Sequence, residues 1–192
     1  MLYTVLKLFV PIFFKIFFFF ESEGEEFIPR KGGVILASNH LSYLDPIALG
    51  VAAPRRLSFM AKEELFRNRF FSFLIRILGA FPVKRGYGDI KALRNAVDIV
   101  KGGKVLVVFP QGTRTSRKED GIKPGIGIIV RKSGVPVVCC RIRGTDIVLP
   151  SEGKKIHLFR KIKVSFSEPL HFGSDMSPHD IAEKILEAIY SL

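Results

Sequence analysis

Residues 104–109 read KVLVVF and give the clearest strand pattern in the chain. An apolar run of this length, without polar alternation, is typical of a strand that is buried on both faces of a parallel sheet. The residues that follow, PQGTRTSRKEDGIKP at 110–124, are rich in the Gly, Thr, Ser, Arg and Lys of a loop. In open α/β sheets ligands bind beyond the carboxyl ends of strands, so this loop is the first place to expect a site.

Strand and helix patterns alternate on both sides of that strand. The predicted strands are 33–39, 57–61, 81–83, 104–109, 135–142 and 161–166, and the predicted helices are 46–53, 63–78, 90–100, 126–132 and one that starts at Ser177. Asp45 and Pro46 suit the N-cap and the first position of the helix predicted at 46–53. This order predicts an α/β fold, with a mixed, largely parallel sheet covered by helices. We expect the α/β domain to span residues 27–192.

Composition indicates a negatively charged partner. The 192 residues carry 30 Lys and Arg against 18 Asp and Glu, a formal net charge of +12. The mean hydropathy is nevertheless +0.24. A chain both basic and apolar favours a membrane surface over DNA. The two cysteines, Cys139 and Cys140, are adjacent in an apolar run, which excludes a disulfide framework and a Cys/His zinc site and predicts two buried core thiols.

The first twenty residues, MLYTVLKLFVPIFFKIFFFF, form a separate apolar segment. Four glutamates follow between residues 21 and 26, and there is no small-residue cleavage site of the kind that ends a signal peptide. Thr4, Lys7, Pro11 and Lys15 fall within an arc of about 80° on a helical wheel. Residues 1–26 are therefore interpreted as a membrane-interfacial helix with lysines toward the headgroups, followed by an acidic link. A spanning helix and a buried core helix are the alternatives.

Residues 39–45, NHLSYLD, contain the candidate catalytic pair. His40 stands where a predicted strand ends, and Asp45 follows at a predicted helix start. A tight turn between the two elements can fold the carboxylate back onto the imidazole. The carboxylate then fixes the tautomer and makes the other ring nitrogen a better proton acceptor. The alternative is a helix-capping aspartate beside an incidental histidine.

Two basic loops are expected near this pair. Gly112 in the loop after 104–109 permits close backbone approach, and Arg114 can grip an anion with two parallel hydrogen bonds. Lys84 and Arg85 form a second basic pair after the short strand 81–83. A His–carboxylate pair between loops suited to phosphate indicates proton removal from a hydroxyl group on a phosphorylated molecule.

With these residues in place, the sequence resembles the glycerolipid acyltransferases, the family of the 1-acyl-glycerol-3-phosphate (lysophosphatidic acid) acyltransferases. Four family blocks occur in order over about half the chain. N-H-x-x-x-x-D is matched by 39–45, G-x-x-F-I-x-R loosely by 79–85, F-P-E-G-T-R-S by 109–115 and V-P-V by 135–137. Two positions depart from the pattern: Gln111 replaces a glutamate and loses its charge, and Thr115 replaces a serine and keeps the hydroxyl.

The resemblance implies a role for each matched position. His40, oriented by Asp45, would take the proton from the free hydroxyl of lysophosphatidic acid, whose oxygen would attack an acyl thioester to give phosphatidic acid. Phosphate binding is expected of Arg85, Arg114 and Lys84, loop and acceptor positioning of Asn39, Gln111, Gly112, Thr113 and Thr115, and an acyl-chain contact of Pro136 and Val137. The donor would be acyl-CoA or acyl carrier protein, and neither a metal nor a further cofactor is required.

The partners expected on this basis are a lipid bilayer, lysophosphatidic acid and the acyl donor, with no nucleic acid. The N-terminal helix would make the enzyme peripheral or monotopic on the cytoplasmic face of the cell membrane. Two other functions stay open: the same chemistry on another lysophospholipid or lyso-aminolipid, which the neutral Gln111 motivates, and a non-catalytic basic membrane-binding module.

Overall fold

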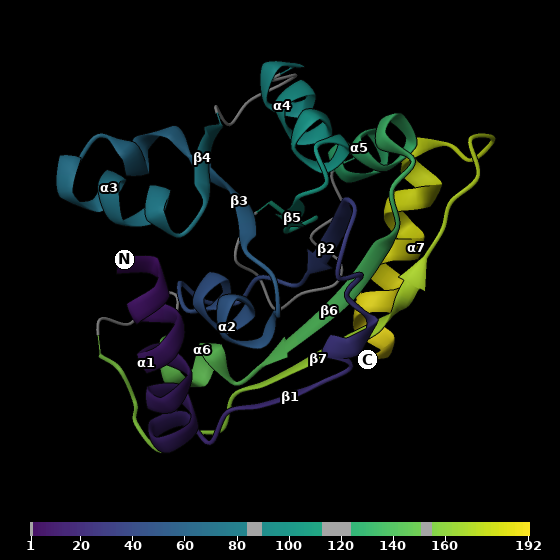
Figure 1. Ribbon diagram of the computed structural model, residues 1–192. Coiled ribbons are helices and arrows are strands. Elements are labelled where there is room, and N and C mark those ends of the chain that lie inside the picture. Colours follow the sequence, from purple (N-terminus) through teal and green to yellow (C-terminus); the bar gives the residue numbers. More distant parts are fainter. Residues whose placement is uncertain (1, 84–89, 113–123, 151–154) are drawn as a thin grey trace.

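The computed structural model describes residues 2–83, 90–112, 124–150 and 155–192 (Figure 1). Its centre is a seven-stranded sheet with the order β1-β7-β6-β2-β5-β3-β4. The strands are β1 (Glu21–Glu23), β2 (Val34–Ser38), β3 (Leu57–Lys62), β4 (Ala80–Val83), β5 (Val105–Val108), β6 (Val137–Arg143) and β7 (Lys163–Leu170). Every neighbouring pair is parallel except β6 and β7, which are antiparallel. The predicted mixed, largely parallel sheet is confirmed.

Helices cover both faces of this sheet (Figure 1). The α-helices are α1 (Leu2–Phe18), α2 (Asp45–Ala52), α3 (Arg69–Ile77), α4 (Ile90–Lys101), α5 (Gly125–Ser133), α6 (Thr145–Val148) and α7 (Pro178–Ser191), with 3₁₀ turns η1 (Glu25–Phe27) and η2 (Glu63–Phe66). One core joins the sheet to α1, α2 and α6, and the other joins it to α4, α5 and α7. The architecture is thus three-layered, as parallel strands require.

The central strands are apolar on both sides because each side faces a core. In β2, Val34 and Leu36 enter the first core, while Ile35 and Ala37 enter the second. All four side chains are buried. The continuous apolar runs of the sequence follow from this two-sided burial, since alternate side chains of a strand point to opposite faces.

The structure divides the helix predicted at 63–78. Residues 63–66 form η2 and residues 69–77 form α3, with the first α3 bond running from the Ser72 N–H to the Asn68 carbonyl. The exposed face of α3 includes Phe70 and Phe73. The apolar spacing alone did not reveal the break at 67–68.

The acidic segment after α1 is part of the sheet. Residues 21–23 form β1, which pairs in parallel with β7. Glu21 forms an ion pair with Lys161 at 2.7 Å, and Glu23 forms one with Lys163 at 2.8 Å. The segment interpreted as a link between two units therefore extends the sheet of the α/β domain, because basic side chains from β7 and the residues before it balance its charge.

The first helix turns part of its polar arc toward the protein. The Lys7 ammonium donates to the carbonyls of Gly50 and Ala53 at 2.8 and 2.6 Å, at the C-terminal end of α2. Unpaired carbonyls and the negative end of the helix dipole suit a cation there. The expectation that Lys7 faces headgroups is therefore wrong, whereas Lys15 is exposed. The outward face of α1 is apolar instead.

Within the described ranges, no helix combines the length and the apolar character that crossing a bilayer requires.

Candidate active site

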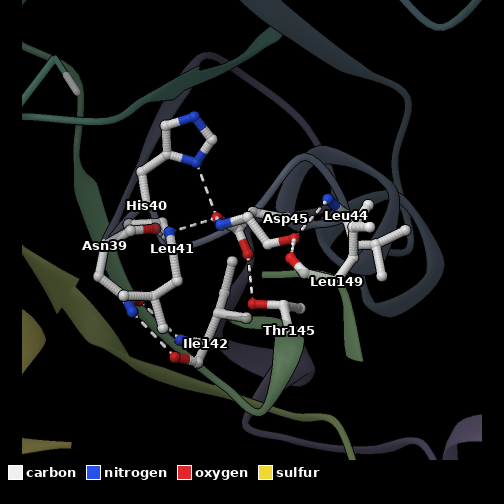
Figure 2. Close-up of polar contacts among 10 residues, drawn as sticks. Asn39, His40, Leu41, Leu44, Asp45, Ile142, Thr145 and Leu149 are labelled. Carbon is white, nitrogen blue, oxygen red and sulfur yellow. Dashed lines mark hydrogen bonds and ion pairs between the residues drawn. The ribbon is translucent and has the colours of Figure 1, made fainter. Parts of the chain in front are cut away.

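The turn after β2 brings His40 and Asp45 together (Figure 2). His40 Nδ1 lies 2.7 Å from Asp45 Oδ2. The same carboxylate oxygen accepts hydrogen bonds from the backbone N–H groups of Leu41 at 2.6 Å and Ser42 at 2.8 Å. The carboxylate thus organises the turn and orients the imidazole at once.

Asp45 is 0% exposed, and its second oxygen is also bound. Oδ1 accepts a hydrogen bond from the Thr145 hydroxyl at 2.6 Å, and Thr145 begins α6 after β6. Because both oxygens accept hydrogen bonds, the orientation of the Asp45 carboxylate is fixed. Its partner His40 therefore carries the proton on Nδ1, which donates to Asp45, and leaves Nε2 as the acceptor.

The helix-capping interpretation of Asp45 is wrong. α2 begins at Asp45 itself, its N-cap residue is Leu44, and no side chain caps the helix by a hydrogen bond. The carboxylate turns back toward His40 instead. By contrast, Ser177 does cap α7 as predicted, since its hydroxyl accepts from the Asp180 N–H at 3.1 Å.

His40 also packs against the end of the neighbouring strand. Its ring stacks on Phe109, the residue after β5, with centroids 4.2 Å apart and an interplanar angle of 19°. The His40 side chain is 16% exposed. The Phe109 ring and the Asp45 carboxylate therefore restrain the imidazole from two directions while part of it reaches solvent.

Asn39 joins the turn to β6. Its side-chain Nδ2 donates to the Ile142 carbonyl at 2.8 Å, and its Oδ1 accepts from the Ile142 N–H at 2.7 Å. These two bonds continue the pairing of β2 and β6 beyond the last strand residue. Asn39 is therefore a positioning residue that fixes the start of the His40 turn.

Thr145 was missed by the sequence analysis, and Ser42 lies two residues from His40 in the sequence. The Ser42 hydroxyl donates to the Leu149 carbonyl at 2.7 Å and accepts from the Leu44 N–H at 3.2 Å. Its contacts are thus structural. A signal for Thr145 existed in the sequence, because Thr145 lies three residues after the predicted strand at 135–142 and so at the same edge of the sheet.

The described part of the loop after β5 lies at this edge as predicted. Gly112 adopts φ +70°, and its N–H donates to the Phe109 carbonyl at 2.9 Å. Gln111 is buried, and its side-chain Nε2 donates to the Tyr190 hydroxyl on α7 at 3.4 Å. The neutral amide that replaces the family's glutamate thus contacts a neutral phenol.

Several predicted site residues lie outside the part of the chain that the structure describes. Thr113, Arg114 and Thr115 lie outside the described residues, as do Lys84 and Arg85. The strands before them, β5 and β4, run parallel to β2 and end at the same edge as His40. Their roles stay predictions.

Pro136 and Val137 are not brought near His40. Val137 begins β6 and pairs with Ile35, five residues before His40. At about 3.3 Å per residue this separation is roughly 16 Å along the strand. Val137 is buried in the core on the α7 side. An acyl-chain contact at these residues would have to lie at the far end of the sheet.

The cysteines are core thiols, as predicted. Cys139 and Cys140 are free and buried. Burial raises the pKa of the Cys139 thiol to about 12, and burial raises the pKa of Cys140 well above its usual range. Both thiols therefore stay protonated and unreactive at neutral pH. Among the described residues, one group has ligands spaced for a metal ion: His179, Asp180 and Glu183, all exposed on α7.

The chain is similar to known acyltransferases. Residues 19–143 match the family model described as Acyltransferase. The chain is 32% identical over 149 residues to the 1-acyl-sn-glycerol-3-phosphate acyltransferase of Bacillus subtilis, covering 77% of this chain and 72% of that protein. It is 30% identical over 138 residues to the Streptococcus pneumoniae protein of the same name, covering 71% of this chain and 49% of that one. The crystal structure of the 1-acyl-sn-glycerophosphate (LPA) acyltransferase from Thermotoga maritima is similar, with a TM-score of 0.68 and 26% identity over 90% of this chain and 72% of that one.

Proposed function

This chain belongs to the acyltransferase family, and on that premise we propose that it transfers a fatty acyl group from a thioester to the free hydroxyl of 1-acyl-glycerol-3-phosphate, forming phosphatidic acid. One observation carries the proposal: the buried Asp45 carboxylate holds His40 Nδ1 at 2.7 Å, with every described contact of the carboxylate made by a donor. The second ring nitrogen of His40 is then the base.

The proposed reaction is a direct transfer. His40 Nε2 takes the proton of the acceptor hydroxyl as its oxygen forms a bond to the thioester carbonyl carbon. The carbon–sulfur bond breaks, and the leaving thiolate receives the proton that the imidazole carries. Asp45 stabilises the imidazolium between these steps. No enzyme nucleophile is invoked, since the Ser42 hydroxyl is bound to backbone and both thiols are buried.

We assign the acceptor phosphate to Arg85 and Arg114, with Lys84 beside them. The support is topological: the strands that precede these residues end at the His40 edge. A guanidinium pair that holds the phosphate would fix the position of the hydroxyl as well as neutralise charge. Asn39, Gln111, Gly112, Thr113 and Thr115 would hold the surrounding loops.

The donor is assigned to the acidic thioesters acyl-CoA or acyl carrier protein. A net charge of +12 favours encounter with either, because a basic surface attracts anionic partners over several ångströms. Thioesters are already activated, so the proposed chemistry uses neither a metal nor another cofactor.

We further propose that the protein works from the cytoplasmic face of the cell membrane through α1. The outward face of this helix is apolar, while Phe14 and Phe18 attach it to the core. The acceptor and the product both have long acyl chains that stay in a bilayer, so an interfacial helix would bring His40 to them.

The decisive experiment is acyl transfer from an acyl thioester to lysophosphatidic acid in lipid–detergent micelles, with His40→Ala alongside and lysophosphatidylcholine as a parallel acceptor. We expect turnover only by the wild type, and only with lysophosphatidic acid as the acceptor. Equal turnover with the choline lipid would retain the base but move the acceptor to another lysophospholipid, the alternative that the neutral Gln111 motivates. Wild-type activity in folded His40→Ala would refute the mechanism.

A further inference from the structure

Two aromatic residues with unusual backbone conformations touch at the end of α1. In the described ranges, Phe19 (φ 42°) and Phe159 (φ 57°) are the non-glycine residues with positive φ. This conformation costs free energy for a bulky side chain, and Gly or Asn is the common choice. The two ring centroids are 6.4 Å apart, yet the residues are 53% and 59% exposed. Core packing does not explain a strained pair left in water, and strain of this kind is concentrated at functional sites.

The segment 155–162 is fastened along α1 by its backbone. The Phe159 N–H donates to the Phe17 carbonyl at 2.7 Å, and the Ile162 N–H donates to the Phe18 carbonyl at 2.9 Å. The Phe159 ring lies 6.0 Å from the ring of Phe17. Figure 1 shows the segment, in yellow-green, running beside α1. These contacts fix the exposed ring of Phe159 in place.

Helix and segment present large apolar side chains to solvent. The segment contributes Ile156, Leu158 and Phe159, and α1 contributes five exposed apolar side chains: Leu8, Phe9, Ile12, Phe13 and Ile16. Together with Phe19 we call these residues the α1–loop face. Exposed apolar side chains gathered on neighbouring elements mark a surface that binds something.

The charges around the α1–loop face identify its occupant. Lys15 on α1 and Lys155 and Arg160 on the segment are exposed. A second copy of the chain would bring these cations against one another. A leaflet with anionic headgroups would pair with them while the apolar side chains enter the acyl boundary.

We propose that the 155–162 segment is a second membrane-insertion element, with Phe159 entering an anionic leaflet beside α1. The inference rests on the membrane association in the proposed function. A protein held at the interface by one helix alone can rotate as a whole about that helix axis, whereas a second contact beside the helix stops this rotation. The segment would therefore set which way the His40 edge of the sheet points relative to the lipid surface.

A tryptophan reporter tests the insertion directly, because the chain has no Trp. Phe159→Trp is expected to shift its emission to the blue on vesicles of phosphatidylcholine and phosphatidylglycerol, and to be quenched by brominated acyl chains. The control is Ile90→Trp, because Ile90 is 61% exposed and starts α4, far from α1 in Figure 1. Emission from Phe159→Trp that vesicles leave unchanged overturns the proposal.

Phe159→Asn tests the energetic contribution of the ring. Asn tolerates the left-handed backbone, so folding is retained and is checked by thermal melting. Partitioning to the same vesicles should fall about tenfold, as expected for withdrawing one aromatic ring from the interface. Ile90→Asn should change it by less than about twofold. Wild-type partitioning in Phe159→Asn, or an equal loss in Ile90→Asn, overturns the proposal, as does a dimer that Phe159→Asn abolishes without any vesicle binding.

Acyl transfer to a water-soluble, short-chain lyso acceptor separates this inference from the proposed function. Phe159→Asn should retain wild-type kcat there. A wild type that binds vesicles through Phe159 but transfers no acyl group would refute the function and leave the insertion element standing.

Discussion

The His40 turn buries a charged group, whereas the α1–loop face exposes apolar ones. In the turn, Asp45 is fully buried and both of its oxygens accept hydrogen bonds. At the face, apolar rings remain in water, and Phe159 does so with a strained backbone. The turn is complete within the protein and suits chemistry. The face is incomplete without a partner, which is what a surface that docks on lipid requires.

The largest expected effect lies in the turn. His40→Ala should lower kcat by about a thousandfold, because general-base catalysis by a positioned histidine contributes on that order. The protein should still fold, but the free energy of unfolding should fall by about 1–3 kcal/mol, because the buried Asp45 carboxylate loses its His40 partner. Steady-state rates on the soluble acceptor, together with a melting curve, check this. A drop smaller than about tenfold would show that His40 is not the base.

Thr145→Val tests whether the second oxygen of Asp45 needs its donor. Loss of the 2.6 Å hydrogen bond leaves a buried carboxylate oxygen without that partner. We expect a fall in kcat of about tenfold and a loss in the free energy of unfolding of about 1–3 kcal/mol. Thr145→Ser keeps the hydroxyl and should restore kcat. If Val and Ser variants behave alike, the hydroxyl does not position the carboxylate.

Arg114→Ala tests the phosphate site that we propose. Removing the proposed charge-assisted contact to phosphate should raise the KM for lysophosphatidic acid about tenfold and lower kcat less. The measurement is the acceptor dependence at saturating acyl donor. Exposed Arg131 at the end of α5 provides a control position, and Arg131→Ala should leave the acceptor KM unchanged. An acceptor dependence unaffected by Arg114→Ala would remove this residue from the phosphate site.

Lys7→Met should affect the other region and leave the turn intact. It removes the hydrogen bonds that fasten α1 to the carbonyls of Gly50 and Ala53. Burial lowers the pKa of Lys7, so part of the gain is already offset by desolvation, and the net loss should be about 1 kcal/mol. Denaturant titration measures it. A fall in kcat on the soluble acceptor would contradict the independence of the two regions.

The smallest effect is expected from thiol reagents. Because burial raises the pKa of both cysteines, iodoacetamide at pH 8 should leave folded protein unlabelled and fully active. The raised pKa values in the folded protein also determine how the free energy of unfolding changes with pH. For Cys139 this stabilising contribution is complete below the ordinary thiol pKa of about 8.5 and is lost as pH rises toward 12. Rapid labelling at pH 8 would mean that β6 opens.

Much of the fold was predictable from local patterns. The strands at 34–38, 105–108 and 137–143 were visible as apolar runs, because strands buried on both faces carry no polar alternation. β1 was not visible, because a Glu-Ser-Glu segment becomes a strand only when β7 supplies its partners. The break between η2 and α3 was equally hidden by regular apolar spacing.

For the site, spacing in the sequence already indicated His40 and Asp45, since a strand-to-helix turn of five residues brings the two side chains within reach. It assigned Asp45 a capping role that the folded turn does not use. It also assigned Lys7 to the membrane, whereas the C-terminal carbonyls of α2 bind it. A local pattern cannot distinguish these outcomes, because the competing partner comes from another element.

The sequence by itself determined the α/β class, the His40–Asp45 pair and the basic, apolar character of the chain, because these depend on periodicity, spacing and composition. Tertiary structure alone decided that Thr145 would meet Asp45 across 100 residues, and that Phe159 would be fastened beside Phe17. Such contacts are set by strand order and by backbone hydrogen bonds between distant segments. The sequence around Thr145 indicates only that it follows a strand, and the sequence around Phe159 does not indicate its partner.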